Sequence, residues 1–164
     1  MITSVSATAP CRVDLAGGTL DIWPLGLLHP GARTVNVAID VEVRVSLRGR
    51  ERGWLVVQNE SRIAVDTRDE LLASAESALV GLVAEHLDLP PFEVELQSAS
   101  PRAAGLGASS ALAVALIAAA KRASGASDGE IASTVHLARD LEARLMQLPT
   151  GIQDHYPALL GGAG

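Results

Sequence analysis

The sequence has few aromatic residues, a single cysteine and no block of basic residues. Aromatic residues make up 2% of the 164 residues although hydrophobic residues make up 48%, so valine, leucine, isoleucine and alanine must build the core. The lone cysteine, Cys11, excludes an intrachain disulfide and gives no sign of an oxidising compartment. The net charge of −6 argues against nucleic acid or an anionic membrane surface as a partner.

Long apolar runs and a leader segment are also missing. The longest apolar stretch, residues 111–120, is about half of what a bilayer span requires. The N-terminal sequence MITSVSATAP lacks the basic start and the long apolar segment of a secretory signal. We therefore expect a soluble, cytoplasmic protein without a membrane partner and with room for one domain.

Strand patterns dominate the first part of the sequence. Residues 34–48 alternate between apolar and polar side chains, which predicts a strand with one buried face. Shorter strands are expected at 54–58, 62–66 and 92–99.

Helix patterns dominate the rest. Thr67 with Glu70 forms a capping box that predicts a helix reaching about Leu87, and Ser127 with Glu130 predicts another reaching about Met146. Residues 108–124 are apolar on nearly all sides, which predicts a buried helix. This arrangement indicates an α+β fold with helices on one face of a mixed or antiparallel sheet.

A glycine-rich loop, SPRAAGLG at residues 100–107, leads directly into that buried helix. A P-loop needs lysine and then serine or threonine after the last glycine, but Ala108 follows Gly107. A dinucleotide fingerprint needs a third glycine where Ser110 stands, and a second strand with an acid about 20 residues further on. The residues alone leave two alternatives, a tight structural turn and a helix N-terminus that binds an anion.

Three segments resemble motifs of the GHMP kinases, the family of galactokinase, homoserine kinase, mevalonate kinase and phosphomevalonate kinase. PRAAGLGASSA resembles the second motif, APCRVDLAGGTLD the first motif of the sugar-kinase branch, and GIQDHY the segment with the catalytic aspartate. The resemblance implies a ribosomal protein S5 domain 2-like fold. It also implies transfer of the γ-phosphoryl group of ATP to a sugar hydroxyl. Its details are closer to heptose 7-phosphate kinase and fucokinase than to galactokinase, which favours the anomeric C1 hydroxyl as acceptor.

The resemblance also implies site residues. Asp154 would be the catalytic carboxylate, and Arg12 would keep it ionised and stabilise the transferred phosphoryl group. Nucleotide contacts would come from Pro101, Gly105, Leu106, Gly107, Ala108, Ser109 and Ser110. Substrate contacts would come from Arg12, Asp14, Gly17, Gly18, Asp21, Gln153 and Asp154. From the residues alone, two alternatives stay open: Arg12 and Asp14 on a short strand could form a surface ion pair, and Asp154 could be a solvated loop acid.

Glu142 is unusual on physical grounds. It lies within an apolar stripe formed by Ile131, Val135, Ala138 and Leu145. A carboxylate there is costly unless it is paired or binds a cation, so a buried ion pair, an escape to solvent and a cation site are the alternatives. The resemblance implies a Mg²⁺ site made by Glu142 with Ser109 or Ser110.

The resemblance implies ATP and Mg²⁺ as cofactors and a small-molecule sugar or sugar phosphate as partner, and it leaves a homodimer open. It further implies that residues 1–164 form the ATP-binding N-terminal domain, lack the C-terminal GHMP domain and turn over poorly alone. A non-catalytic nucleotide- or sugar-binding module and another GHMP kinase, of galactokinase or mevalonate kinase type, stay open. The missing third glycine argues against a dinucleotide-binding oxidoreductase.

Overall fold

One mixed sheet forms the framework of the computed structural model, which describes residues 4–126 and 131–163. The strands are β1 Val5–Ala16, β2 Val35–Gly49, β3 Trp54–Gln58, β4 Ser61–Val65 and β5 Phe92–Ser98. Within the described residues they form a five-stranded sheet in the order β1-β2-β5-β3-β4. Neighbouring strands are antiparallel except β3 and β5, which run parallel. The predicted strands and the mixed sheet are therefore confirmed, although β1 is longer than the short strand expected around Val13.

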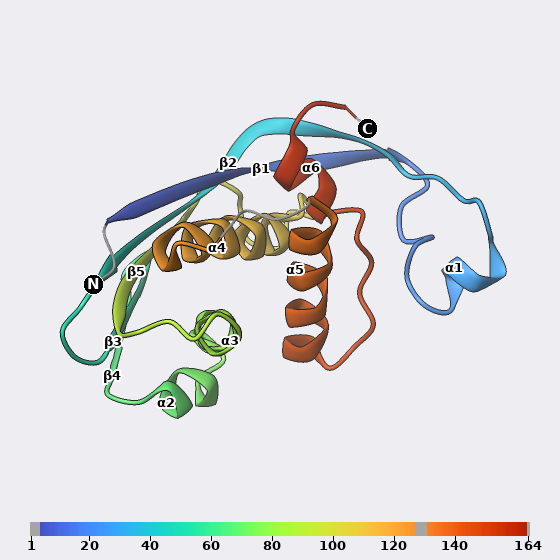
Figure 1. Ribbon diagram of the computed structural model, residues 1–164. Coiled ribbons are helices and arrows are strands. Elements are labelled where there is room, and N and C mark those ends of the chain that lie inside the picture. The colour runs from blue at the N-terminus through green and yellow to red at the C-terminus, as the bar shows by residue number, and fades with distance from the viewer. Residues whose placement is uncertain (1–3, 127–130, 164) are drawn as a thin grey trace.

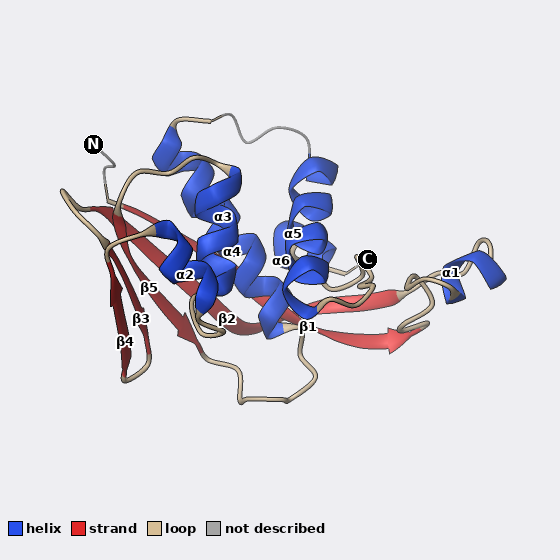
Figure 2. Cartoon of the chain, turned by 90° about the horizontal axis from the view of Figure 1, so that it is seen from below, coloured by secondary structure: helices blue, strands red, loops and turns tan. Residues whose placement is uncertain are grey.

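Helices cover one face of this sheet (Figures 1 and 2). They are α1 Leu25–Leu28, α2 Arg68–Ala73, α3 Ala78–His86, α4 Ala108–Ser124, α5 Ile131–Met146 and α6 His155–Leu160. Helix α4 packs across β1 and β2, and α3, α5 and α6 pack against α4. Only α1, among the described helices, stands apart, in a loop that projects from the ends of β1 and β2 (Figure 1). The predicted α+β class with helices on one face is confirmed.

The core lies between α4 and the sheet. Val43, Val45 and Leu47, on the alternating face of β2, are fully buried. The alanines of α4 are buried as well, and their small side chains let the helix approach the strands closely. Aliphatic side chains thus build most of the core, as the composition predicts, with Phe92 as the largest buried side chain.

The expected continuous helix from Thr67 to Leu87 is wrong, because the chain breaks between α2 and α3. Thr67 does cap α2, since its Oγ1 accepts a hydrogen bond from the Glu70 amide at 3.4 Å. Ser77, which is buried, donates its hydroxyl to the Leu71 carbonyl at 2.8 Å and satisfies the end of α2. The second capping box, residues 127–130, lies outside the described residues.

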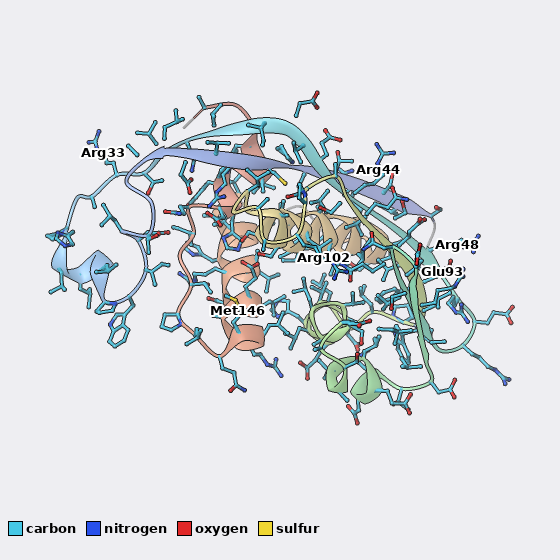
Figure 3. The ribbon with its side chains drawn as sticks, turned by 180° about the vertical axis from the view of Figure 1, so that it is seen from behind. Arg33, Arg44, Arg48, Glu93, Arg102 and Met146 are labelled. Atoms are coloured by element: carbon cyan, nitrogen blue, oxygen red, sulfur yellow. The ribbon has the colours of Figure 1, made fainter. Side chains whose placement is uncertain are left out.

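Polar contacts along the strands and at the chain end complete the fold. Arg48 of β2 and Glu93 of β5 face each other, with Nη2 and Oε2 3.1 Å apart (Figure 3). Near the C-terminus, Ala163 pairs with Val37 of β2. Within the described residues, no helix is both long and apolar enough to cross a membrane.

Candidate active site

Three segments that are far apart in the sequence meet at the N-terminus of α4. They are the end of β1, the glycine loop at residues 100–107, and the loop after α5 that ends at Asp154. The Arg12 amide of β1 donates to the Leu106 carbonyl of the glycine loop at 3.0 Å. The sheet and α4 thereby fix the place at which the predicted motifs come together.

Arg12 connects the glycine loop to the predicted catalytic carboxylate. Its Nη1 donates to the Gly105 carbonyl at 2.5 Å, and its Nη2 lies 2.8 Å from Asp14 Oδ2 and 2.7 Å from Asp154 Oδ1. The residue is only 7% exposed, so the alternative of a surface ion pair with Asp14 is wrong. A buried guanidinium must be compensated by anions and carbonyls, and here these partners come from all three segments.

Asp154 is held in a partly buried position directly before α6. Burial raises the pKa of Asp154 above its ordinary value of 3.8, and Asp14 acts in the same direction. The Arg12 guanidinium lowers the pKa but does not outweigh burial. The expected proximity of Arg12 is confirmed, and Arg12 lowers the pKa as expected, but desolvation is the larger effect and makes the net shift upward.

The glycines of the loop are required by their backbone conformations. Gly105 and Gly107 have φ of +71° and +69°, in the left-handed region that other residues adopt at a cost. A Cβ at Gly105 would meet open space, whereas one at Gly107 would lie 3.0 Å from Arg12 Cδ. The loop, Arg12 and Asp154 line a cavity of about 310 Å³, which the N-terminus of α4 also faces. An anion placed there would meet amides and the positive end of the helix dipole.

Two more cavities adjoin the loop, and Ser109 lines all three. One, of about 440 Å³, is lined by the β3–β4 turn (Gln58, Asn59), the end of β5 and Arg102. The other, of about 240 Å³, is lined by Ser110, Glu142 and Asp154. Sequence reasoning missed the first of these cavities, because its walls come from segments that only the fold brings together.

Glu142 is buried and paired on one carboxylate oxygen. Ser110 Oγ donates to Oε2 at 2.9 Å, and His155 Nε2 lies 2.7 Å from the same oxygen. Escape to solvent is therefore wrong. The apolar stripe predicted for α5 is also partly wrong, because the side chains of Ile131 and Leu145 are 49% and 39% exposed. The buried face of α5 instead comprises Thr134, Val135, Ala138, Leu141 and Glu142.

The serine and glutamate oxygens at this place suit a hard divalent cation. Ser110 and Glu142 face the same cavity as Asp154, and Mg²⁺ prefers oxygen ligands from a few protein groups together with phosphate and water. Within residues 4–126 and 131–163, no group of three or more His, Cys, Asp or Glu side chains could hold a metal without such help. These donors therefore fit a Mg²⁺ ion that arrives with a phosphate ligand.

The predicted substrate residues lie near Asp154, but several already bind the chain itself. Gln153 Oε1 accepts from the Thr19 amide at 2.9 Å, and its Nε2 lies 3.4 Å from Asp14 Oδ2. Asp21 Oδ2 accepts hydrogen bonds from two backbone amides of the Asp154 loop. Gly17 and Gly18 lie at the end of β1, where Gly17 has φ +74° and a Cβ would overlap a backbone carbonyl, which gives Gly17 a structural reason to be glycine.

His155, to which the sequence analysis assigned no role, lies buried in the site. Its ring is 1% exposed and its Nε2 lies 2.7 Å from Glu142 Oε2, although neither ring nitrogen makes a hydrogen bond of good geometry with the described residues. The histidine follows Asp154 directly in the sequence, and its position at the start of α6 directs it inward. No spacing rule relates residue 155 to residue 142, so only the packing of α5 against α6 reveals the pair.

Comparisons with known proteins agree with this geometry. The family described as GHMP kinases N terminal domain matches residues 73–162. No curated protein matches the sequence significantly. The fold is similar to a D-glycero-D-manno-heptose 1-phosphate kinase from Bacteriodes thetaiotaomicron, with TM-score 0.83, 23% identity, and coverage of 97% of this chain and 54% of that one.

Two further solved structures share the fold. Methanococcus jannaschii mevalonate kinase gives a TM-score of 0.75 at 16% identity, over 99% of this chain and 52% of that one. Lactococcus lactis galactokinase, in complex with galactose, gives 0.73 at 17% identity, over 93% of this chain and 41% of that one. The chain thus spans about half the length, or less, of these solved structures.

Proposed function

This chain belongs to the GHMP kinases, and we propose that it supplies the nucleotide-binding part of an ATP-dependent sugar kinase. The observation that carries the proposal is the position of Arg12, which contacts the glycine loop and the Asp154 carboxylate at once. Phosphoryl transfer requires that a phosphate site and an acid–base group lie next to each other with positive charge between them. Arg12 supplies that charge at the boundary of the two.

The three cavities around Ser109 would hold, in turn, the base and ribose of the nucleotide, its phosphates and the sugar acceptor. The cavity of about 440 Å³ would take the base and ribose, with contacts from Asn59 and Pro101. The cavity of about 310 Å³ would take the phosphates against Gly105 and the first amides of α4. The cavity of about 240 Å³, which Asp154 shares with the phosphate cavity, would take the acceptor end.

Ser109, Ser110 and Glu142 would hold Mg²⁺ together with the nucleotide phosphates. When bound, Mg²⁺ supplies neutralisation of the negative charge on the phosphates. The Ser110–Glu142 hydrogen bond of 2.9 Å keeps the two protein ligands side by side before the ion arrives.

Asp154 would take the proton from the attacking sugar hydroxyl. A hydroxyl is a weak nucleophile, so a positioned base contributes about 10²–10⁴-fold in rate. Because burial raises its pKa above the ordinary value of 3.8, Asp154 is a stronger base than an exposed aspartate. Arg12 would then stabilise the charge on the transferred phosphoryl group.

The acceptor we propose is the anomeric C1 hydroxyl of a heptose 7-phosphate or a fucose-like sugar. Support for the anomeric hydroxyl comes from the Gly17–Gly18 and Gln153–Asp154 elements of the motifs, and support for a heptose comes from the similar fold of a D-glycero-D-manno-heptose 1-phosphate kinase. Gln153 lines the cavity proposed for the acceptor, and Asp14 and Gly18 lie next to Gln153. Specificity of this kind depends on few polar contacts.

Two measurements test the proposal. The 164-residue chain should bind a non-hydrolysable ATP analogue with Mg²⁺, and NAD should not compete. The full-length protein should phosphorylate at least one sugar in a parallel screen of hexoses, deoxyhexoses and heptose 7-phosphates. Competition by NAD, or binding of the ATP analogue without phosphorylation of any small-molecule alcohol, would refute the kinase assignment.

A further inference from the structure

The loop that carries Asp154 is fastened to a distant part of the chain by one carboxylate. Asp21 lies between β1 and α1, and its Oδ2 accepts hydrogen bonds from the amides of Ile152 at 2.5 Å and Gln153 at 3.0 Å. These are the two amides directly before Asp154. A carboxylate that receives two backbone N–H groups restrains both peptide planes at once, and charge-assisted bonds of this kind are the stronger ones.

Gly151 provides a second, independent sign that this contact is built into the site. A Cβ at Gly151 would overlap the carboxyl group of Asp21. Gly151 is not one of the glycines with a left-handed backbone, so the reason for glycine is space and not conformation. The absence of a side chain at 151 therefore allows the approach of Asp21.

A second restraint acts on the same loop from the other side. Asn36 Nδ2 of β2 donates to the Gln153 carbonyl at 3.1 Å. The peptide groups before Asp154 are thus fixed by Asp21 on their N–H side and by the sheet on their C=O side. Asp154 is left with its carboxylate 2.7 Å from Arg12.

We propose that Asp21 is a positioning residue, which holds residues 151–153 so that Asp154 reaches its place against Arg12. This role differs from the sugar contact that sequence resemblance assigns to Asp21, and it rests on the proposed function through Asp154. Asp21 is exposed, so its bonds add little to global stability. Their effect is local, because a displacement of about 1 Å in a reacting group can cost about 10²-fold in rate.

Four variants of the full-length protein test the proposal. Asp21→Ala removes the acceptor, and Gly151→Ala displaces Asp21 without removing any polar group. Asp21→Asn keeps one oxygen that can accept both amides. Gly26→Ala is the control, because it adds the same methyl group in α1, at an ordinary 3.4 Å from the backbone carbonyl oxygens of Leu20 and Asp21, and leaves the Asp21 carboxylate in place.

We expect Asp21→Ala and Gly151→Ala to lower kcat by about 10²-fold while KM for the sugar changes less than about threefold. Asp21→Asn should recover most of kcat, and Gly26→Ala should behave as the parent. Gly151→Ala should add no further loss in the Asp21→Ala background, because both changes break one contact. A sugar-contact role predicts the opposite pattern, with KM raised by Asp21→Ala and additive effects in the double variant.

Hydrogen exchange, which does not depend on turnover, tests this proposal separately from the kinase assignment. In the 164-residue chain, hydrogen exchange at the Ile152 and Gln153 amides should become faster in Asp21→Ala and Gly151→Ala and stay unchanged in Gly26→Ala. If those amides exchange equally fast in the parent and in Asp21→Ala, the positioning role is wrong whatever the reaction. If the exchange changes as expected but no sugar is phosphorylated, the kinase assignment fails and the restraint stands.

Discussion

His155 Nε2 lies 2.7 Å from Glu142 Oε2, next to Ser110 in the first turn of α4. Both residues are almost fully buried, and Ser110 donates to the same carboxylate oxygen. The contact joins α5, which carries the glutamate, to α6, which begins at the histidine. The carboxylate we assign to Mg²⁺ is therefore also a structural joint between two helices.

Replacement of His155 should reveal how much this joint stabilises the fold. His155→Leu leaves the buried Glu142 carboxylate with Ser110 alone, and we expect the free energy of unfolding to fall by about 3 kcal/mol. His155→Gln offers an N–H donor of similar reach and should recover most of that loss. Urea denaturation of the three proteins provides the measurement, and a leucine variant as stable as the parent would contradict the prediction.

Glu142→Gln separates a cation ligand from a purely structural carboxylate. A ligand role predicts that Mn²⁺, used as a spectroscopic substitute for Mg²⁺, binds the complex of this chain with an ATP analogue at least about 10-fold more weakly. A purely structural pair predicts unchanged Mn²⁺ affinity and a loss of several kcal/mol in stability. The control is Glu85→Gln, because Glu85 is an exposed glutamate that pairs with Arg144 away from the site.

Much of the fold could be predicted because its local signals are strong. The alternation in β2 and the apolar sequence of α4 each specify one element without reference to the rest of the chain. The break at Ser77 could not be predicted, since it depends on a buried serine hydroxyl that reaches the carbonyl of Leu71. Helix α6 was missed because Pro157 and the surrounding turn residues suggest a loop, although proline is tolerated in the first turn of a helix.

The site was predicted as a set of residues but not as a set of contacts. Motif resemblance named Arg12, Asp154 and Glu142, and the structure brings all three to the N-terminus of α4. The partners of Asp21 and of Glu142 could not be predicted, because they depend on how distant loops pack. The net direction of the Asp154 pKa shift was missed for the same reason, since burial is a property of the folded chain.

Gly105→Ala should weaken nucleotide binding, because Gly105 lines the cavity that we propose for the phosphates. A matched control is Gly125→Ala, because both glycines have φ of +71° and a Cβ at either would meet open space, but Gly125 ends α4 away from the site. Both variants should lose about 1 kcal/mol of stability from the left-handed backbone. Only Gly105→Ala should weaken binding of the ATP analogue, measured by calorimetry. Equal binding by the two variants would mean that the loop is only a turn.

Asp154→Asn should abolish most of the turnover without loss of nucleotide binding. The substitution keeps the shape of the side chain and removes the base, so kcat in the full-length protein should fall by about 10²–10⁴-fold. Binding of the ATP analogue to the 164-residue chain should stay within about threefold of the parent. A variant that retains most of its turnover would move the assignment to Asp14, the other carboxylate that contacts Arg12.

The pH dependence of turnover follows from the direction of the Asp154 shift. Because the pKa of Asp154 is raised above 3.8 by burial, the base is lost by protonation at a higher pH than an exposed aspartate would require. Turnover of the full-length protein should therefore fall as the pH drops through this raised value, and the acid limb of kcat should lie above pH 3.8.

The stability of the fold should show the opposite pH dependence. The ionised Asp154 carboxylate lowers the free energy of unfolding above the raised pKa, and this cost disappears as the pH falls through it. The difference in free energy of unfolding between the parent and Asp154→Asn should therefore shift in the parent's favour as the pH falls from 7 toward 4, as thermal unfolding at several pH values would measure. A difference that shifts the other way, with an acid limb of the parent's kcat at or below pH 3.8, would show that Arg12 and not burial controls the ionisation of Asp154.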